Sequence, residues 1–150
     1  MKKLSDYSKR LVVAGSRSYN NYDEFEDVMN RYVKWWGIHD LAIISGDAAY
    51  GADAMVIRYC KENNIPYFLY PADWDKYGKR AGIIRNCEMR DACTHLLAFW
   101  DKVSKGTAHM VEICYERDDI KVMMCLVQPD TYLQPANDRK WSNRRYRKAA

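Results

Sequence analysis

The chain has 150 residues, of which 48% are hydrophobic and 29% charged, the size and composition of one folded domain rather than a disordered segment. Its formal net charge of +4 permits an anionic ligand but falls short of the strongly basic character of a dedicated nucleic-acid-binding domain. The five cysteines are odd in number and show no CxxC spacing, which indicates reduced core thiols. With no apolar run near the ~20 residues of a membrane span and no signal-peptide core, we expect a cytoplasmic protein without a membrane partner.

Predicted strands and helices alternate along the chain. Short apolar runs indicate buried strands at 10–15, 41–45, 67–70, 95–100 and 121–127. Apolar residues at spacings of three and four predict helices at 23–36, from about 53 to 63, at 79–92, and after Thr107. Residues 71–78, which are rich in proline, glycine and aromatic residues, are expected to form an ordered surface loop.

This alternation predicts an α/β fold with a doubly wound, mainly parallel five-stranded sheet and helices on both faces. The expected strand order is 3-2-1-4-5. We expect a loose N-terminus at 1–9, a Rossmann-like domain at 10–127, and a basic, disordered tail at 128–150 that carries an Arg/Lys run.

Ligands of doubly wound sheets bind at the carboxyl ends of the strands, where the winding reverses. In the expected order this point lies between the first and fourth strands. The loops that meet there are Gly15 to Arg17 and Asp101 to Thr107, with the loop from Gly46 to Asp53 beside them. The sequence therefore predicts one crevice lined by three loops.

The segment from Ser104 to Thr107 separates a strand from a helix, and a helix N-terminus attracts phosphate through its unpaired N–H groups. The alternative is that Ser104 or Thr107 only caps the helix while Gly106 permits the turn. Arg17 suits a bidentate phosphate contact, although a surface salt bridge would equally explain it. Lys105 offers a second cation.

Glycines in these loops, Gly15, Gly46 and Gly106, are expected to let backbone approach a ligand.

Three aspartates could accept a hydrogen bond from a ribose hydroxyl: Asp47, Asp53 and Asp101. Helix capping or first-turn charge is the alternative for Asp53, and Asp101 is better placed for a ligand or for chemistry. Trp74, Tyr77 and Trp100 could stack on a base or belong to the core.

His109 and Glu112 lie three residues apart on the helix, so they could act as an acid–base pair or form a structural hydrogen bond. We expect no metal site and no bound cofactor, because no metal-ligand set, Walker A loop or G-x-S-x-G motif is present.

Short strings in order across residues 10–127 resemble the YspA-related SLOG family, formerly DUF2493, of the SMF/DprA and LOG superfamily of Rossmann-like domains. They are Val13-Ala-Gly-Ser-Arg17, Ile44-Ser-Gly46, Gly51-Ala-Asp53, Ile65-Pro66, Pro71-Ala-Asp-Trp74, Tyr77-Gly-Lys79, Ala81-Gly82, Arg85-Asn86, Glu88-Met89, Ala98-Phe-Trp-Asp101, Ser104-Lys-Gly-Thr107 and His109.

The resemblance implies a nucleotide-type ligand, a bacterial or phage source, and, by analogy with the superfamily, a homo-oligomer. The implied binding residues are Gly15, Ser16, Arg17, Gly46, Asp47, Gly51, Asp53, Arg85, Asn86, Asp101, Ser104, Lys105, Gly106 and Thr107. For hydrolysis, the candidates are Asp101, Glu88, His109 and Glu112.

The chain departs from the family pattern at two places. The stretch Ser45 to Asp53 is one residue longer than is usual for the family. LOG-type hydrolases carry a catalytic glutamate three residues beyond the threonine, and here that position is Met110.

Three hypotheses follow. The first is binding of a phosphate-bearing nucleotide or derivative, such as an ADP-ribose or NAD type, for sensing or sequestration. The second is a LOG-type phosphoribohydrolase that cleaves an N-glycosidic bond. The third is a nucleic-acid-associated protein acting through the basic tail, where Trp141 and Tyr146 stand among arginines.

Overall fold

Strands and helices alternate along residues 2–128, the part of the chain that the computed structural model describes. The strands are β1 (Lys9–Gly15), β2 (Leu41–Ser45), β3 (Tyr67–Leu69), β4 (His95–Trp100) and β5 (Lys121–Leu126). The α-helices are α1 (Tyr22–Trp36), α2 (Ala52–Asn63), α3 (Trp74–Tyr77), α4 (Ala81–Ala92) and α5 (Lys105–Tyr115). Short 3-10 turns, η1 and η2, occupy Leu4–Asp6 and Gly78–Arg80.

The five strands form one sheet in the order β3-β2-β1-β4-β5, and all four pairings are parallel. The predicted order is therefore confirmed. The central strand β1 pairs with β2, where Leu11 faces Ile43, and with β4, where Leu11 faces His95. The winding reverses between β1 and β4, so their carboxyl ends lie side by side.

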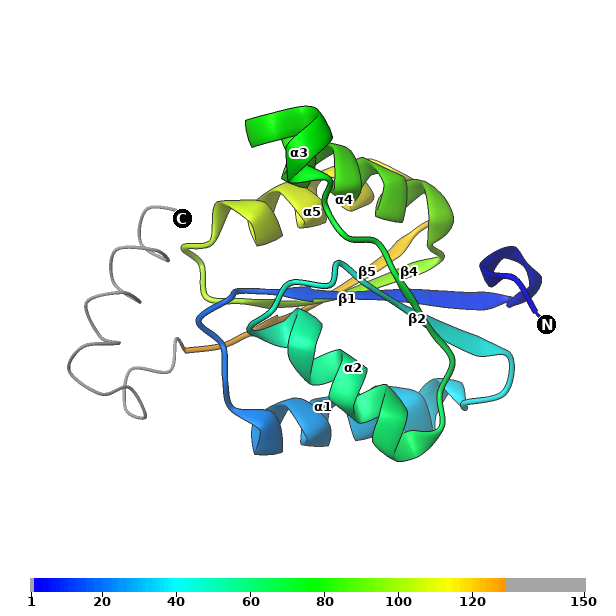
Figure 1. The fold of residues 1–150 in the computed structure, drawn as a ribbon. Helices are drawn as coiled ribbons and strands as arrows, with labels where there is room; N and C mark the ends of the chain where they lie inside the picture. The colour runs from blue at the N-terminus through cyan, green and yellow to red at the C-terminus, as the bar shows by residue number, and fades with distance from the viewer. Residues whose placement is uncertain (1, 129–150) are drawn as a thin grey trace.

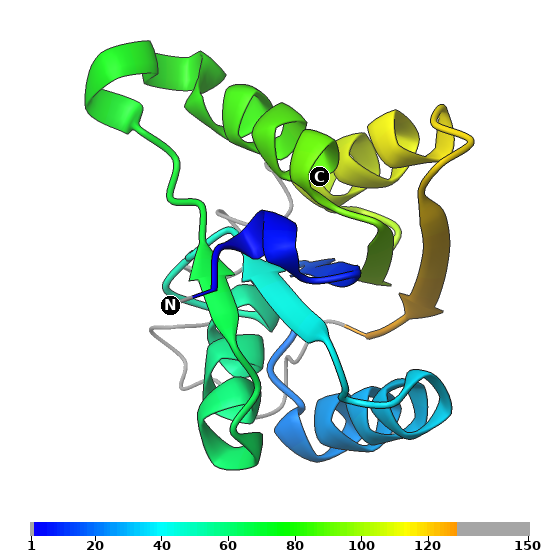
Figure 2. The same cartoon turned by 90° about the vertical axis from the view of Figure 1, so that its right-hand side faces the viewer.

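Helices cover both faces of the sheet. In Figures 1 and 2, α1 and α2 lie on one face, and α3, α4 and α5 lie on the other. Leu11 and Val13 pack into the core on the α1 and α2 side, whereas Val12 and Ala14 pack into the core on the α4 and α5 side. Because alternate residues of a strand point to opposite faces, a strand covered on both sides needs an unbroken apolar run.

The ends of α1 follow from local chemistry. The Oδ1 atom of Asn21 accepts a hydrogen bond from the N–H of Glu24 at 3.1 Å, which caps the helix one residue earlier than predicted. Gly37 ends the helix with a φ of 80°, a conformation that glycine adopts easily. No helix within residues 2–128 combines the length and apolarity needed to cross a bilayer.

The expected surface loop at 71–78 is partly helical, which corrects that prediction. Asp73 accepts a hydrogen bond from the N–H of Lys76 at 3.1 Å and so starts α3. The chain then continues through η2, and α4 begins at Ala81 rather than at Lys79. The proline and glycine residues punctuate this segment, but a capping aspartate is enough to close one helical turn between them.

Residues 2–8, expected to be loose, contain η1 and are held against Asp40. The N–H of Ser8 donates to Asp40 Oδ2 at 3.0 Å, and Lys2 Nζ pairs with Asp40 Oδ1 at 3.1 Å. These hydrogen bonds, with the Ser8 contacts first, lower the pKa of the Asp40 carboxyl. The expected tail at 128–150 lies outside the described residues, apart from Gln128.

All five cysteines are free thiols, and Cys60, Cys93 and Cys114 are buried, as a reduced apolar core requires.

Candidate functional site

A cavity of about 390 Å³ opens where the carboxyl ends of β1 and β2 face the start of α5. It lies at the point where the winding reverses, the place predicted for ligand binding. Loops after β1 and β2, the start of α2, the α3 and α4 segment, and the first turns of α5 all contribute. The lining residues are Ala14, Gly15, Arg17, Ala48, Asp53, Trp74, Lys79, Gly82, Ile83, Arg85, Asn86, Met89, Ser104, Lys105, Gly106, Thr107, His109 and Met110.

Two glycines, Gly15 and Gly51, let the surrounding loops pack closely, and Gly15 also lines the cavity. A Cβ atom on Gly15 would lie 2.6 Å from the Cβ of Ala52, and one on Gly51 would lie 2.3 Å from the carbonyl oxygen of Ser16. Gly51 also has a φ of 73°. These glycines therefore bring the first turn of α2 against the end of β1.

Gly46 packs in a similar way, because a Cβ there would lie 2.6 Å from Arg85 Nη1. Gly46, Gly51, Ser16 and Asp47 do not line the cavity. Ser16 is buried, and its Oγ accepts the N–H of Asp101 at 3.3 Å.

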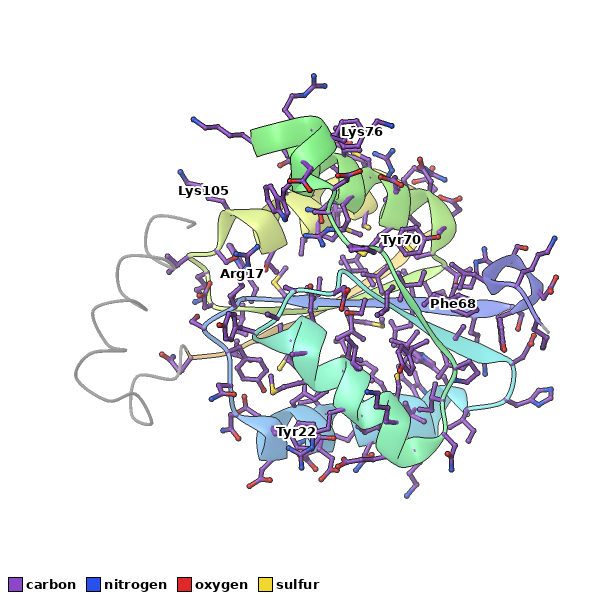
Figure 3. The ribbon with its side chains drawn as sticks, viewed as in Figure 1. Arg17, Tyr22, Phe68, Tyr70, Lys76 and Lys105 are labelled. Carbon is purple, nitrogen blue, oxygen red and sulfur yellow. The ribbon has the colours of Figure 1, made fainter. Side chains whose placement is uncertain are left out.

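Arg17 lies on the cavity wall between the end of β1 and the first turn of α5 (Figure 3). No group within residues 2–128 forms a hydrogen bond or an ion pair with its guanidinium, so the predicted alternative of a surface salt bridge is not found there. A planar, permanently charged fork with free donors is suited to a phosphate group.

The first turn of α5 faces the same cavity. Ser104 occupies the N-cap position, but its side chain makes no capping hydrogen bond and instead lies 3.3 Å from Thr107 Oγ1. The N–H groups of Lys105, Gly106 and Thr107 have no acceptor among the described residues. Gly106 lies inside α5 rather than in a loop, which corrects its predicted role in the turn. An uncapped helix start of this kind attracts anions.

Asp101 was the carboxylate predicted to be best placed for a ligand, but the structure gives it a local role. Its Oδ1 accepts the N–H groups of Val103 at 2.9 Å and Ser104 at 2.7 Å. Its Oδ2 accepts the hydroxyl of Ser18 at 3.2 Å. Asp101 is buried and does not line the cavity, so it shapes the loop that leads into α5.

Asp53 is instead the carboxylate that reaches the cavity, and no other carboxylate of residues 2–128 lines it. Burial raises the pKa of Asp53 to about 6, although Arg85, the N–H of Ala48 and Arg17 act in the opposite direction. The Ala48 N–H donates to Asp53 Oδ2 at 3.1 Å. Asp53 does not cap α2 but lies in its first turn, where negative charge is the other role expected for it, and its Oδ2 also holds the turn that precedes the helix.

Arg85 spans from α4 to the β2 loop. Its Nη1 donates to the carbonyl oxygens of Gly46 and Tyr70, and its Nε donates to Asn86 Oδ1 at 3.2 Å. Burial lowers the pKa of Arg85, while Asp53 raises it. Because Nη1 bonds to carbonyl oxygens in the loops that follow β2 and β3, the Arg85 side chain holds α4 close to both loops.

Asn86 and His109 join α4 to α5. The amide nitrogen of Asn86 lies 3.3 Å from the carbonyl oxygen of Gly106 and 3.1 Å from His109 Nδ1. Asn86 is buried, and the His109 side chain lines the cavity.

Of the three aromatic residues predicted to stack on a base, only Trp74 lines the cavity. Trp74 is 52% exposed and lies at the rim of the cavity, where a Cβ on Gly82 would lie 3.5 Å from its ring. Tyr77 does not line the cavity. Trp100 donates from Nε1 to the carbonyl oxygen of Ser104 at 2.9 Å and lines a different, apolar groove.

Of the four residues predicted for hydrolysis, only His109 lines the cavity. Glu88 is exposed on α4, and Glu112 lines the groove beside Trp100, so neither reaches the cavity. Met110, at the position that corresponds to the catalytic glutamate of LOG-type hydrolases, is buried. The predicted His109 and Glu112 acid–base pair is therefore not formed.

Sequence reasoning missed several lining residues, including Lys79, Ile83 and Met89. Lys79 follows Gly78 at the start of a helical segment, and a basic residue in that position was a usable signal. Ile83 and Met89 carried no such signal, because apolar helix positions usually belong to the core.

Comparison with known proteins gave two matches. The model of the YspA, cpYpsA-related SLOG family matches residues 9–77, which run from β1 to α3. The "Gene 61 protein" of Mycobacterium phage D29 is 32% identical over 111 residues, or 67% of this chain and 84% of that protein. No solved structure matches the chain. The family match covers the β1 and β2 side of the cavity and ends before α4 and α5.

Proposed function

This chain belongs to the YspA, cpYpsA-related SLOG family, a nucleotide-related group of Rossmann-like domains, and from that premise we propose that the cavity binds a phosphate-bearing nucleotide or nucleotide derivative. An ADP-ribose-type molecule is the ligand class we favour, with sensing or sequestration as the role.

One observation carries the proposal: the guanidinium of Arg17, which has no hydrogen-bond or ion-pair partner within residues 2–128, and the uncapped N-terminus of α5 line the same cavity. Three backbone N–H groups and a cation form a site for one phosphate group. Lys79 and Lys105 add positive charge at the rim.

The remaining walls suit the rest of such a ligand. Asp53 can accept a hydrogen bond from a ribose hydroxyl, as predicted from the sequence. Trp74 offers an aromatic face for a base. Ile83 and Met89 supply the apolar surface that small-molecule sites commonly have.

Isothermal titration of the full chain with ADP-ribose tests the proposal. We expect Arg17→Ala to weaken binding by at least about tenfold, because a hydrogen bond to a charged group contributes about 1.5–3 kcal/mol. The matched control is Arg31→Ala, since Arg31 lies on α1 and pairs only with Asp27 among the described acidic residues. Equal affinities of the two variants would contradict the proposal.

The LOG-type N-glycosidase is the second candidate, and Asp53 is the observation that favours it. A carboxyl with a pKa of about 6 inside the cavity is protonated in a minor fraction of molecules at neutral pH, and this proton can pass to the departing base while water adds to the sugar carbon. Incubation with AMP and NAD, followed by chromatography for free base, tests this reaction. Base release that Asp53→Asn abolishes would establish hydrolysis, whereas intact nucleotide after incubation would favour the binder.

A further inference from the structure

The amide of Asn86 lies between two groups whose hydrogen-bonding roles are fixed. Arg85 Nε, which can only donate, lies 3.2 Å from Asn86 Oδ1. The carbonyl oxygen of Gly106, which can only accept, lies 3.3 Å from Asn86 Nδ2. Both contacts require the same orientation of the amide, with its oxygen toward Arg85 and its nitrogen toward α5.

This orientation determines the state of the neighbouring imidazole. His109 Nδ1 lies 3.1 Å from Asn86 Nδ2, and an amide nitrogen offers only donors. Nδ1 must therefore accept, and the proton of the neutral ring resides on Nε2. No group within residues 2–128 makes a hydrogen bond with Nε2, and the ring lines the cavity.

We propose that Asn86 is a positioning residue that holds His109 as an Nε2–H donor, and that a phosphoryl oxygen of the ligand accepts from it. The ligand part of this inference rests on the proposed function, whereas the tautomer does not. Three features of one helix then serve a single anionic group: the free N–H groups of the first turn, the cation of Lys105, and the His109 donor one turn further on.

The geometry also argues against His109 as a general base here. A base needs an acceptor nitrogen facing the substrate, but the acceptor Nδ1 is engaged by Asn86. Glu112, which could have held a different tautomer, lines the groove on the other side of α5. His109 is thus suited to donating a hydrogen bond from Nε2 to an acceptor atom of a ligand.

Two-bond proton–nitrogen correlation spectra of the full chain at pH 8, where an ordinary imidazole is neutral, test the tautomer. We expect the Nε2–H pattern for His109, with its signals identified by their loss in His109→Gln. In Asn86→Asp the carboxylate can only accept, so Nδ1 must carry a proton and the pattern should change. Asn64→Asp, an exposed change at the end of α2, is the matched control.

An Nδ1–H pattern for His109 in the unsubstituted protein would overturn the proposal, and that measurement stands even if Asn86→Asp fails to fold. An unchanged tautomer in a folded Asn86→Asp protein would also overturn it. The signals of His95, whose Nδ1 lies 2.7 Å from Thr94 Oγ1, report whether the variant keeps its fold.

Titration with ADP-ribose tests the ligand part. We expect His109→Leu to weaken binding about tenfold, because it removes a donor to a charged oxygen. His109→Gln places an amide N–H near the position of Nε2, so it should retain most of the affinity. Full affinity in His109→Leu, or the same loss in both variants, would overturn the phosphoryl contact. If the unsubstituted protein bound no ADP-ribose, the proposed function would fail with that contact, and the spectra would still decide the role of Asn86.

Discussion

At the scale of single residues, the cavity is organised by a partly buried carboxylate, Asp53, and two arginines, Arg17 and Arg85. Asp53 contacts the N–H of Ala48 and lies in the field of Arg85 and Arg17, yet burial dominates and raises its pKa. No ion pair closer than 4.0 Å joins Asp53 to either arginine. A carboxylate that is partly buried without a direct cationic partner costs stability when it is ionised.

Asp53 therefore predicts a pH dependence of folding. Its pKa is about 6 in the folded state and near 3.8 in the unfolded state, so the folded state binds more protons between these values. Stability is fully present below about pH 4 and falls as the pH rises toward 6, by on the order of 2 kcal/mol.

We expect Asp53→Asn to remove this fall, as measured by urea denaturation at pH 4 and pH 7. Asp75→Asn, at an exposed position on α3, is the matched control and should leave the fall in place. The same pH dependence in Asp53→Asn and in the unsubstituted protein would show that Asp53 does not cause it.

At the scale of elements, the start of α5 depends on the residue that ends β4. Asp101 accepts two backbone N–H groups ahead of the helix and one hydroxyl from the β1 loop, so it fixes where α5 begins. The first turn is left with free N–H groups because the capping carboxylate is used before the helix rather than on it. The same residue joins the loops after β1 and β4, which form one side of the cavity.

Asp101→Ala is expected to lower the free energy of unfolding by on the order of 2 kcal/mol, because the N–H groups of Val103 and Ser104 lose the carboxylate that accepts their part-buried hydrogen bonds. Urea denaturation at pH 7 measures this, with Asp119→Ala as the exposed control. A loss of ADP-ribose binding at unchanged stability would instead restore the direct ligand role that the sequence first suggested.

At the scale of the whole molecule, charge is divided unevenly along the chain. Residues 129–150 hold six lysines and arginines and two aspartates, which accounts for the entire net charge of +4. The rest of the chain is consequently neutral overall, and four of its basic residues line the cavity: Arg17, Lys79, Arg85 and Lys105.

The third hypothesis, nucleic-acid association, concerns only this tail. We expect deletion of residues 129–150 to move elution from a heparin column to a lower salt concentration, since polyanion binding depends on the number of cations engaged. The control is a full-length protein in which four exposed basic residues of the folded part are replaced by neutral ones, so that it also loses a net charge of +4. These residues are Lys3, Lys34, Lys61 and Arg80. Equal shifts in both proteins would show that the tail has no special role.

The sequence by itself determined the α/β class, the strand order and the place of the cavity. Short apolar runs such as 96–100 are typical of strands covered on both faces, and their alternation with helices predicts a sheet with one point where the winding reverses. The loops that meet there follow from connectivity alone. Arg17 could be assigned to this point for the same reason.

Only the tertiary structure decided which side chains face the cavity. Asp53 and Asp101 both follow strands, but Asp101 is drawn to the nearest free N–H groups, whereas Asp53 is turned into the pocket by the packing of Gly51 and Gly15. Asn86 gained its role through Gly106 and His109, twenty and twenty-three residues away. Such contacts depend on how α4 packs against α5, and no local pattern of residues predicts which side chains of the two helices meet.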